Sequence, residues 1–569
     1  SINSSTGLRA MPSPDIVPPE PGVAERSPPR GARKHVTVVS AGSILGRSEA
    51  TEECEPMSIF GFTTTTGQLD WQQIAPRISA MKVTNADFLR ATFASSILQC
   101  FGRSLFLRDA YKYSFKTLSI DQYWSHSWAD KSWKKILVLL WLNNGLLALI
   151  SGTLAAAAMM PLFSLGFLPA IPGNLWKDEA EAETVVSLWC LVAGLVVFLL
   201  VLLLARPRKM VFVDKVCLNE GDGQMKQEGM LNMGACLKHS KSLLVLWEKS
   251  YAQQLISIFE LATFLKCHEG EKTHLDIRPT MLAPFFLVNF FGSAFIALAQ
   301  IFVPFDHDWT IFVVAACFTP YFMACGWLLL RYFASVQGLK DQLNHFGVDD
   351  AVCPCCLCGH RVPGTVAGAE NSTCQCDRKI ILECINVWFG SIEEFERFVS
   401  SKVARAFSQR LGNFLCQYWM VVVLSAPIFW AHLDLIAVSL ARTDYLAASS
   451  LAVTAFTWWL GILPAAYVLF IALVAKSQRR QMRRTGIAQK LCWRIVPPSA
   501  LLLLLLVAGM YQTFCIRYIT NAVLGIGIFG GTLIIPCYLI WRASTKNTAM
   551  FNPRSVAEEA SRVRAMRGF

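Results

Sequence analysis

Charged residues are scarce in this chain of 569 residues. They make up 16% of the sequence, whereas 54% of it is hydrophobic, and the mean hydropathy is +0.41. Soluble domains usually carry about a quarter charged residues, so the composition argues against a soluble protein. The sequence also contains no glycine-rich phosphate loop and no Ser-His-Asp set that rises above chance. The low charge and the high hydrophobic content favour a membrane protein.

The first fifty residues lack the apolar core that a secretory signal places after a basic start. They are rich in Pro, Ser and Arg instead, and we expect residues 1–57 to form a disordered cytoplasmic tail. The net charge is +12, but the basic residues collect at expected membrane boundaries. No nucleic-acid partner is therefore expected.

Long apolar runs predict the membrane spans, because a bilayer core about 30 Å thick requires about 20 apolar residues per helix. Eight segments meet this requirement: 136–160, 184–205, 281–303, 309–330, 414–440, 446–475, 495–516 and 521–541. We predict a predominantly α fold, a polytopic transmembrane helical bundle of about eight spans in four pairs (136–205, 281–330, 414–475 and 495–541). Asp434 is the clearest ionisable residue inside them. No broken-helix pair is expected.

The loops between the spans alternate in charge, and this alternation predicts the orientation. Residues 177–183 carry four acids against one lysine, whereas the loop 476–494 has seven basic residues and no acid, and the tail 542–569 is basic. We expect an integral, multi-pass membrane protein with both termini in the cytoplasm. The loop 476–494 either binds anionic lipid head groups, at about 1 kcal/mol per basic residue, or only fixes the topology.

Two of the segments expected in the cytoplasm, 60–135 and 209–279, have the patterns of a small α/β domain. Residues 210–214 and 242–247 are typical of strands, and 230–238 and 252–265 of helices. This alternation predicts a parallel sheet, with a third strand at 118–124. The domain would be assembled from both segments, with the first pair of spans inserted between them.

The residues of this domain resemble Toll-type (TIR) domains, in a variant found in multi-span proteins of unicellular algae. The resemblance rests on residues 123–128, 211–217 and 240–251, and on Glu260, nine residues after Tyr251. In TIR domains that split NAD, a glutamate at this offset is catalytic. The resemblance therefore implies a TIR-like domain, NAD as the substrate, Glu260 as the catalytic residue and self-association into a homo-oligomer. The chain departs from the family at Ile256-Ser257, where TIR domains usually have Trp-Cys.

The chemistry of NAD cleavage fits a carboxylate, because a carboxylate beside the ribose stabilises an oxocarbenium-like transition state. The alternative for Glu260 is a glutamate that caps or pairs on a surface helix. His126, which lies between two serines after the expected strand, is a weaker catalytic candidate. Its alternative role is to satisfy local hydrogen bonds.

The segment 331–412 is rich in cysteine, which in a reducing cytosol favours metal over disulfides. The candidate zinc ligands are Cys353, Cys356, Cys374 and Cys376, with Cys355, Cys358 and His360 as alternates. The second pair is Cys-x-Cys rather than Cys-x-x-Cys, and unliganded or lipidated thiols are the alternative.

The function expected is membrane signalling or sensing, by self-association or NAD cleavage. A transporter or channel with a regulatory domain and a non-catalytic scaffold are the other hypotheses.

Overall fold

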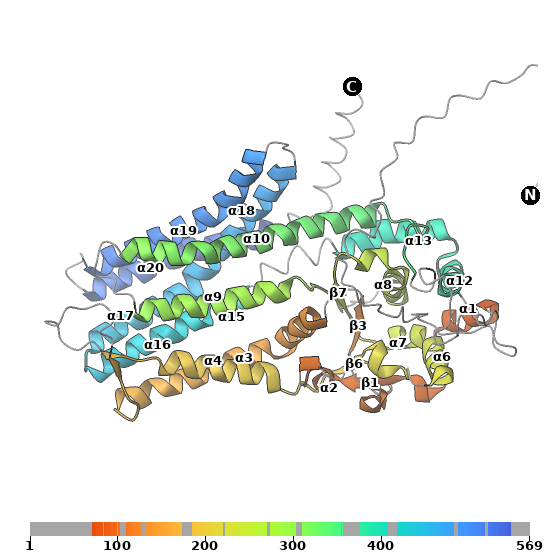
Figure 1. Ribbon diagram of the computed structural model, residues 1–569, viewed down its shortest axis with the longest axis horizontal. Helices are drawn as coiled ribbons and strands as arrows, with labels where there is room; N and C mark the ends of the chain where they lie inside the picture. The colour runs from red at the N-terminus through yellow and green to blue at the C-terminus, as the bar shows by residue number, and fades with distance from the viewer. Residues whose placement is uncertain are drawn as a thin grey trace, which may run out of the picture. The chain divides into compact units, whose positions relative to one another are not determined.

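The computed structural model describes residues 71–83, 85–99, 101–102, 110–127, 132–172, 185–219, 222–269, 274–302, 310–353, 356, 376–407, 418–482, 487–517 and 522–547. The chain divides into two units, Ser1–Cys54 and Glu55–Phe569, and every described residue belongs to the second. This second unit is mostly helical and contains a six-stranded sheet (Figure 1). The tail expected at 1–57 lies outside the described residues.

The sheet is parallel at its centre. Its strands are β1 (Arg90–Phe93), β2 (Phe115–Lys116), β3 (Gln122–His126), β6 (Met210–Phe212), β7 (Ser242–Trp247) and β8 (His274–Pro279), in the order β2-β1-β6-β3-β7-β8. Strands β6, β3, β7 and β8 are parallel, and β1 is antiparallel to β6. The parallel strands have the order 2-1-3-4, which is common in doubly wound sheets.

The predicted strands differ from the observed ones in their bounds. Strand β7 covers the predicted range, whereas β6 is shorter because Asp214 begins the helix α5 (Asp214–Cys217). Strand β3 begins at Gln122 rather than 118 and extends through His126, and Leu118 is exposed. Strands β1, β2 and β8 were not predicted, although β8 alternates buried and less buried residues in the way expected for a strand.

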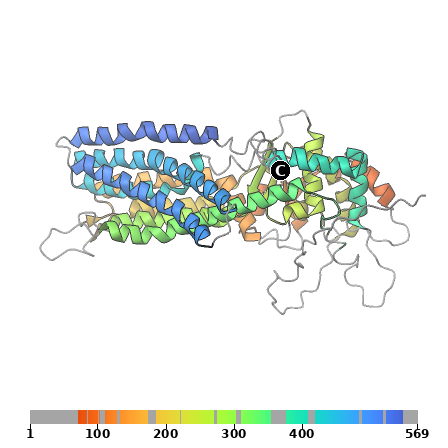
Figure 2. The same ribbon diagram turned by 90° about the horizontal axis from the view of Figure 1, so that it is seen from above.

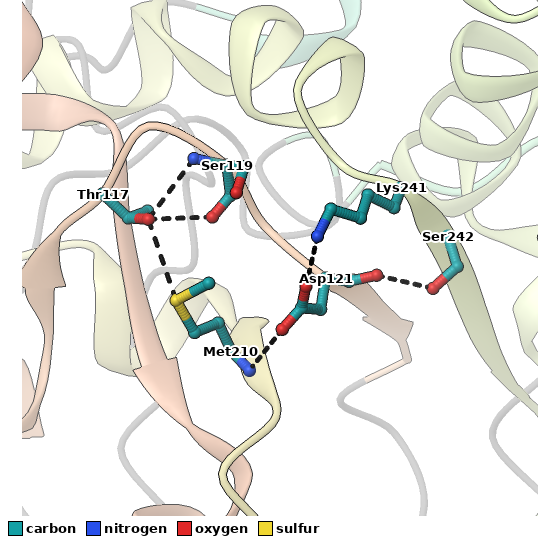
Figure 3. Close-up of polar contacts among 6 residues, drawn as sticks. All are labelled: Thr117, Ser119, Asp121, Met210, Lys241 and Ser242. Atoms are coloured by element: carbon teal, nitrogen blue, oxygen red, sulfur yellow. Dashed lines mark hydrogen bonds and ion pairs between the residues drawn. The ribbon is translucent and has the colours of Figure 1, made fainter.

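One aspartate joins the starts of the three central strands (Figure 3). The carboxylate of Asp121 accepts hydrogen bonds from the backbone N–H of Met210 at 3.0 Å and from Lys241 Nζ at 2.8 Å. Its carbonyl accepts a hydrogen bond from Ser242 Oγ at 2.7 Å. Burial acts to raise the pKa of Asp121, but these donors outweigh it and the pKa lies below its usual value. Asp121 thus holds β6, β3 and β7 in register where these strands begin.

Helices from three chain segments pack around this sheet. They are α1 (Trp71–Ser79), α2 (Ala94–Leu98), α5, α6 (Gly223–Leu231), α7 (Met233–Lys238), α8 (Leu255–Cys267), α12 (Asp377–Phe389) and α13 (Ile392–Phe398). The predicted helix 230–238 is divided at Asn232 between α6 and α7. Helix α12 packs on α1 and α8, where the Trp388 ring stacks on Phe259 at 5.0 Å and its Nε1 donates to the Ser79 carbonyl. We call this assembly the α/β domain.

We call a second group of helices, most of them long, the long helices: α3 (Ser132–Ser164), α4 (Trp189–Leu204), α9 (Leu282–Phe302), α10 (Thr310–Asn344), α15 (Tyr418–Leu424), α16 (Ala426–Ala441), α17 (Tyr445–Phe456), α18 (Leu463–Met482), α19 (Ile487–Arg517) and α20 (Ala522–Asn547). Between α3 and α4, the strands β4 (Ile171–Pro172) and β5 (Val185–Val186) pair antiparallel. Within the described residues, four segments are long and apolar enough to cross a membrane: Ser132–Ser164, Leu282–Ala299, Tyr445–Gln478 and Arg494–Cys515. The predicted total of eight spans stays a prediction.

Helices α15 and α16 form a bent pair, and the expectation of no broken helix is wrong at this point. The two helices meet at 53°, and counting them as one span raises the number of candidate spans to five. The bend follows from Pro427, which lacks a backbone N–H and cannot continue the helical hydrogen bonds. Side chains from other helices satisfy carbonyls near the bend: Ser293 donates to Leu424 and Trp459 to Val422.

Helix α10 connects the long helices to the α/β domain. It packs on α9, α18 and α19 and also contacts the turn Tyr251–Gln253, and both views show it running from the long helices to the domain (Figures 1 and 2). Its 35 residues correspond to about 52 Å of helix.

Candidate functional site

The candidate site is built around Glu260, which lies on α8 where this helix packs on β3. Its Oε1 accepts a hydrogen bond from Tyr123 Oη at 2.8 Å, and its Oε2 accepts one from Ser125 Oγ at 2.7 Å. Tyr123 and Ser125 are two residues apart in β3, and alternation along a strand places both on the same face. The strand thus presents two hydroxyl donors to one carboxylate.

Tyr251 extends this network beyond the carboxylate. Its Oη lies 2.8 Å from Ser125 Oγ and donates to the Ser257 carbonyl at 3.1 Å. When Glu260 is ionised, Ser125 donates to it. When Glu260 is protonated, the order can reverse, so that Glu260 donates to Ser125, Ser125 to Tyr251 and Tyr251 to Ser257. The network can therefore satisfy both protonation states of Glu260.

The surroundings of Glu260 place its titration near neutrality. Burial raises the pKa of Glu260 to about 7; the Ser125 and Tyr123 hydrogen bonds act to lower it, and the negative charge of Asp214 acts to raise it. A carboxyl group with a pKa close to the working pH exchanges protons most effectively. Burial also raises the pKa of both Tyr123 and Tyr251, so the phenols act as neutral donors. The site therefore suits a single titrating carboxylate.

His126 is not brought into this network. Alternation along β3 turns its side chain to the face opposite Ser125. Burial lowers the pKa of His126, Asp214 acts to raise it, and Lys135 acts to lower it. Asp214 therefore influences both predicted catalytic residues, but the structure does not join them as an acid–base pair.

No role was predicted for Tyr123 or Ser125, although both lie within the strand motif 123–128. A signal was present: two hydroxyl side chains at alternate positions of a strand whose other residues are mostly apolar. Such a strand must find partners for these hydroxyls on one face, because buried polar groups are hydrogen-bonded.

Three predicted zinc ligands fall within the described residues. Cys353 is buried, Cys356 is exposed and Cys376 is half-buried. The sulfur atoms of Cys356 and Cys376 are 3.6 Å apart, and two thiolates on one tetrahedral zinc lie about 3.8 Å apart. The other candidates, Cys355, Cys358, His360 and Cys374, lie outside the described residues. Among the residues that the structure describes, no group of three potential ligands is close enough to hold a metal ion.

Asp434 has a structural role rather than an open binding position. One of its oxygens accepts hydrogen bonds from Ser187 Oγ at 2.6 Å and the Cys190 N–H at 2.9 Å, and the other accepts one from the Leu191 N–H at 2.8 Å. These N–H groups belong to the first turn of α4, whose early backbone donors have no partner within the helix. The Asp434 side chain on α16 therefore caps α4.

Lys476 and Arg494 of the predicted lipid-binding loop are exposed. Arg483 and Arg484 lie outside the described residues. No family model, curated protein or solved structure matches this chain. The Glu260 network is therefore the site from which a function can be inferred.

Proposed function

We propose that this chain is a multi-pass membrane protein whose α/β domain cleaves the bond between nicotinamide and ribose in NAD, with Glu260 as the catalytic carboxylate. The observation that carries the proposal is a half-buried carboxylate held by two hydroxyl donors, with a pKa of about 7. Ser125 is near the carboxyl end of β3, and Tyr251 follows β7. In sheets with this strand order, ligands bind between these two strands at their carboxyl ends.

The proposed reaction is a hydrolysis. The C1′–N bond breaks with its electron pair going to nicotinamide, which leaves as a neutral molecule, and the ribose carbon becomes an oxocarbenium-like centre. Ionised Glu260 stabilises this positive charge. Water then forms a bond to C1′ and loses a proton, for which the carboxylate is the nearby acceptor. The products are ADP-ribose, nicotinamide and a proton.

The membrane arrangement is part of the proposal. The α/β domain and the basic segments lie on the cytoplasmic side, about eight spans cross the bilayer, and both termini are cytoplasmic. The alternation of acidic and basic loops supports this arrangement, and the four to five candidate spans supply its apolar helices. The protein would therefore act at a membrane surface, as a signalling or sensing protein would.

The test is nicotinamide release from NAD by the full chain purified in detergent. The parent should release nicotinamide, with a rate that rises as the pH increases through about 7, because ionised Glu260 is the reactive form. Glu260→Gln should lower the rate about a hundredfold or more. The matched control is Glu228→Gln, which changes a half-buried glutamate of α6 in the same domain. A folded parent that releases no nicotinamide at any protein concentration contradicts the proposal and favours a self-associating scaffold.

The bend between α15 and α16 supports a second candidate function, transport across the membrane. Interrupted helices form the substrate sites of many transporters, and here the bend faces the π-helical turn Thr457–Ile462, in which Trp459 stacks on Phe429 at 4.2 Å. Uptake of labelled solutes into proteoliposomes tests this function. Uptake by the parent that is lost on Pro427→Ala would favour it over NAD cleavage.

A further inference from the structure

Lys135 is a buried lysine at the start of the first candidate span. It lies in the first turn of α3 and is 6% exposed, although lysines are rarely buried without a partner. Its Nζ donates a hydrogen bond to the Ser127 carbonyl and lies 4.0 Å from Glu248 Oε1. Glu248 is also buried, at 8% exposure. The two charges therefore stabilise each other where α3 meets the sheet.

The partners of Lys135 lie at the ends of the neighbouring strands β3 and β7. Ser127 directly follows β3, and Glu248 directly follows β7. The Ser127 and Ser250 hydroxyls are 3.2 Å apart, so the two strand ends are also joined to each other. A single lysine from the first span thus links the segments that present the partners of Glu260.

A continuous path of contacts leads from Lys135 to Glu260. Ser127 is two residues beyond Ser125, which donates to Glu260. Ser250 is followed by Tyr251, whose hydroxyl contacts Ser125. Moving the two strand ends apart would therefore withdraw hydroxyl partners from the Glu260 carboxylate.

We infer that Lys135 is a positioning residue for Glu260, so that the first candidate span forms part of the site. The biological meaning of this inference rests on the proposed function, whereas the positioning of Glu260 by Lys135 does not depend on it. Without the Lys135 cation, the end of β3 is released from α3 and Ser125 is no longer held against Glu260. Because the Ser125 hydrogen bond favours the ionised carboxylate, its loss favours the protonated form. A displacement of α3 would have the same effect, which couples the span to the site.

The test measures the titration of Glu260 directly. Infrared difference spectra of the full chain in detergent are recorded between acidic and alkaline pH, and Glu260→Gln identifies the band of this carboxyl group. The principal variant is Lys135→Met with Glu248→Met, because removing both charges avoids leaving an unpaired buried carboxylate that could prevent folding. The control is Lys134→Met, which removes the same charge from the neighbouring, half-buried residue.

The double variant should raise the midpoint of the Glu260 titration by about one unit, the effect of losing one hydrogen bond to a charged group. Glu248→Gln alone and Lys134→Met should leave the midpoint at the parent value, because both keep the bond from Lys135 to Ser127. An unchanged midpoint in the folded double variant overturns the inference. This measurement needs no turnover, so a parent that does not cleave NAD refutes the proposed function without deciding this test. If the parent is active, nicotinamide release at pH 6 should fall about tenfold in the double variant.

Discussion

Replacing Glu260 by Gln should stabilise the protein at alkaline pH while it removes the proposed activity. The glutamine amide reproduces the hydrogen bonds of the protonated carboxyl group. Its oxygen accepts from the Tyr123 hydroxyl and its N–H donates to the Ser125 hydroxyl, which in turn donates to the Tyr251 hydroxyl. The ionised form of Glu260 is disfavoured in the folded protein, because burial raises its pKa from 4.5 to about 7. The parent must therefore hold an unfavourable charge above neutrality.

The size and sign of this effect follow from the pKa difference. A glutamate whose pKa is raised in the folded state binds its proton more tightly there than in the unfolded chain. It therefore lowers stability as the pH rises from about 4.5, and the loss is complete once the pH passes about 7. The pKa difference of about 2.5 between the folded and unfolded states corresponds to a loss of about 3 kcal/mol in the free energy of unfolding. Most of this loss develops between about pH 5 and 8.

The assay is thermal unfolding of the detergent-purified chain, followed by intrinsic fluorescence between pH 5 and pH 8. The stability advantage of Glu260→Gln over the parent should grow by about 2 to 3 kcal/mol across this range. The control is Glu228→Gln, which measures how removing one carboxylate elsewhere in the domain changes the stability. A difference between Glu260→Gln and the parent that is the same at both pH values would refute the account of a buried, proton-sharing Glu260.

Two further predictions concern other parts of the chain. Asp434→Ala should lower the free energy of unfolding by about 2 kcal/mol or more, because it leaves the buried N–H groups of α4 without their acceptor. The control Asp444→Ala, which removes an exposed cap from α17, should lower the free energy of unfolding by about 1 kcal/mol, and equal shifts in the melting temperature of the two variants would contradict this prediction. Elemental analysis should find zinc bound to the purified chain, and this zinc should be lost in Cys356→Ser and Cys376→Ser. The control Cys492→Ser, which changes an exposed cysteine of α19, should retain the zinc, and a zinc content that is independent of Cys356 and Cys376 would exclude a thiolate site there.

The sequence predicts local elements better than the contacts between them. Strand β7 was predicted in its observed range because Ser242–Trp247 is a short apolar run between charged residues. The bend before α16 was missed because the segment 414–440 is predominantly apolar, and its composition alone hides the effect of Pro427. Only the missing N–H of this proline indicates the interruption.

The candidate site shows the same limit. Glu260 was predicted through a resemblance, whereas its partners Tyr123 and Ser125 come from β3, more than a hundred residues earlier in the chain. No local pattern relates these positions, because their proximity depends on how α8 packs on the sheet. Asp434 likewise appeared as an isolated acid in a span, and only the fold shows that it caps α4.

The central position of β3 has a consequence for the synthesis of the protein. This strand leaves the ribosome before α3 and α4, whereas both of its neighbours, β6 and β7, are made after them. If α3 and α4 insert into the membrane as proposed, the emerging strand has two unpaired edges during their insertion, and exposed edges invite pairing with other chains. In that arrangement the sheet can close only after α4 has returned the chain to the side of the membrane where β3 lies, so a failure of insertion would also prevent the α/β domain from folding.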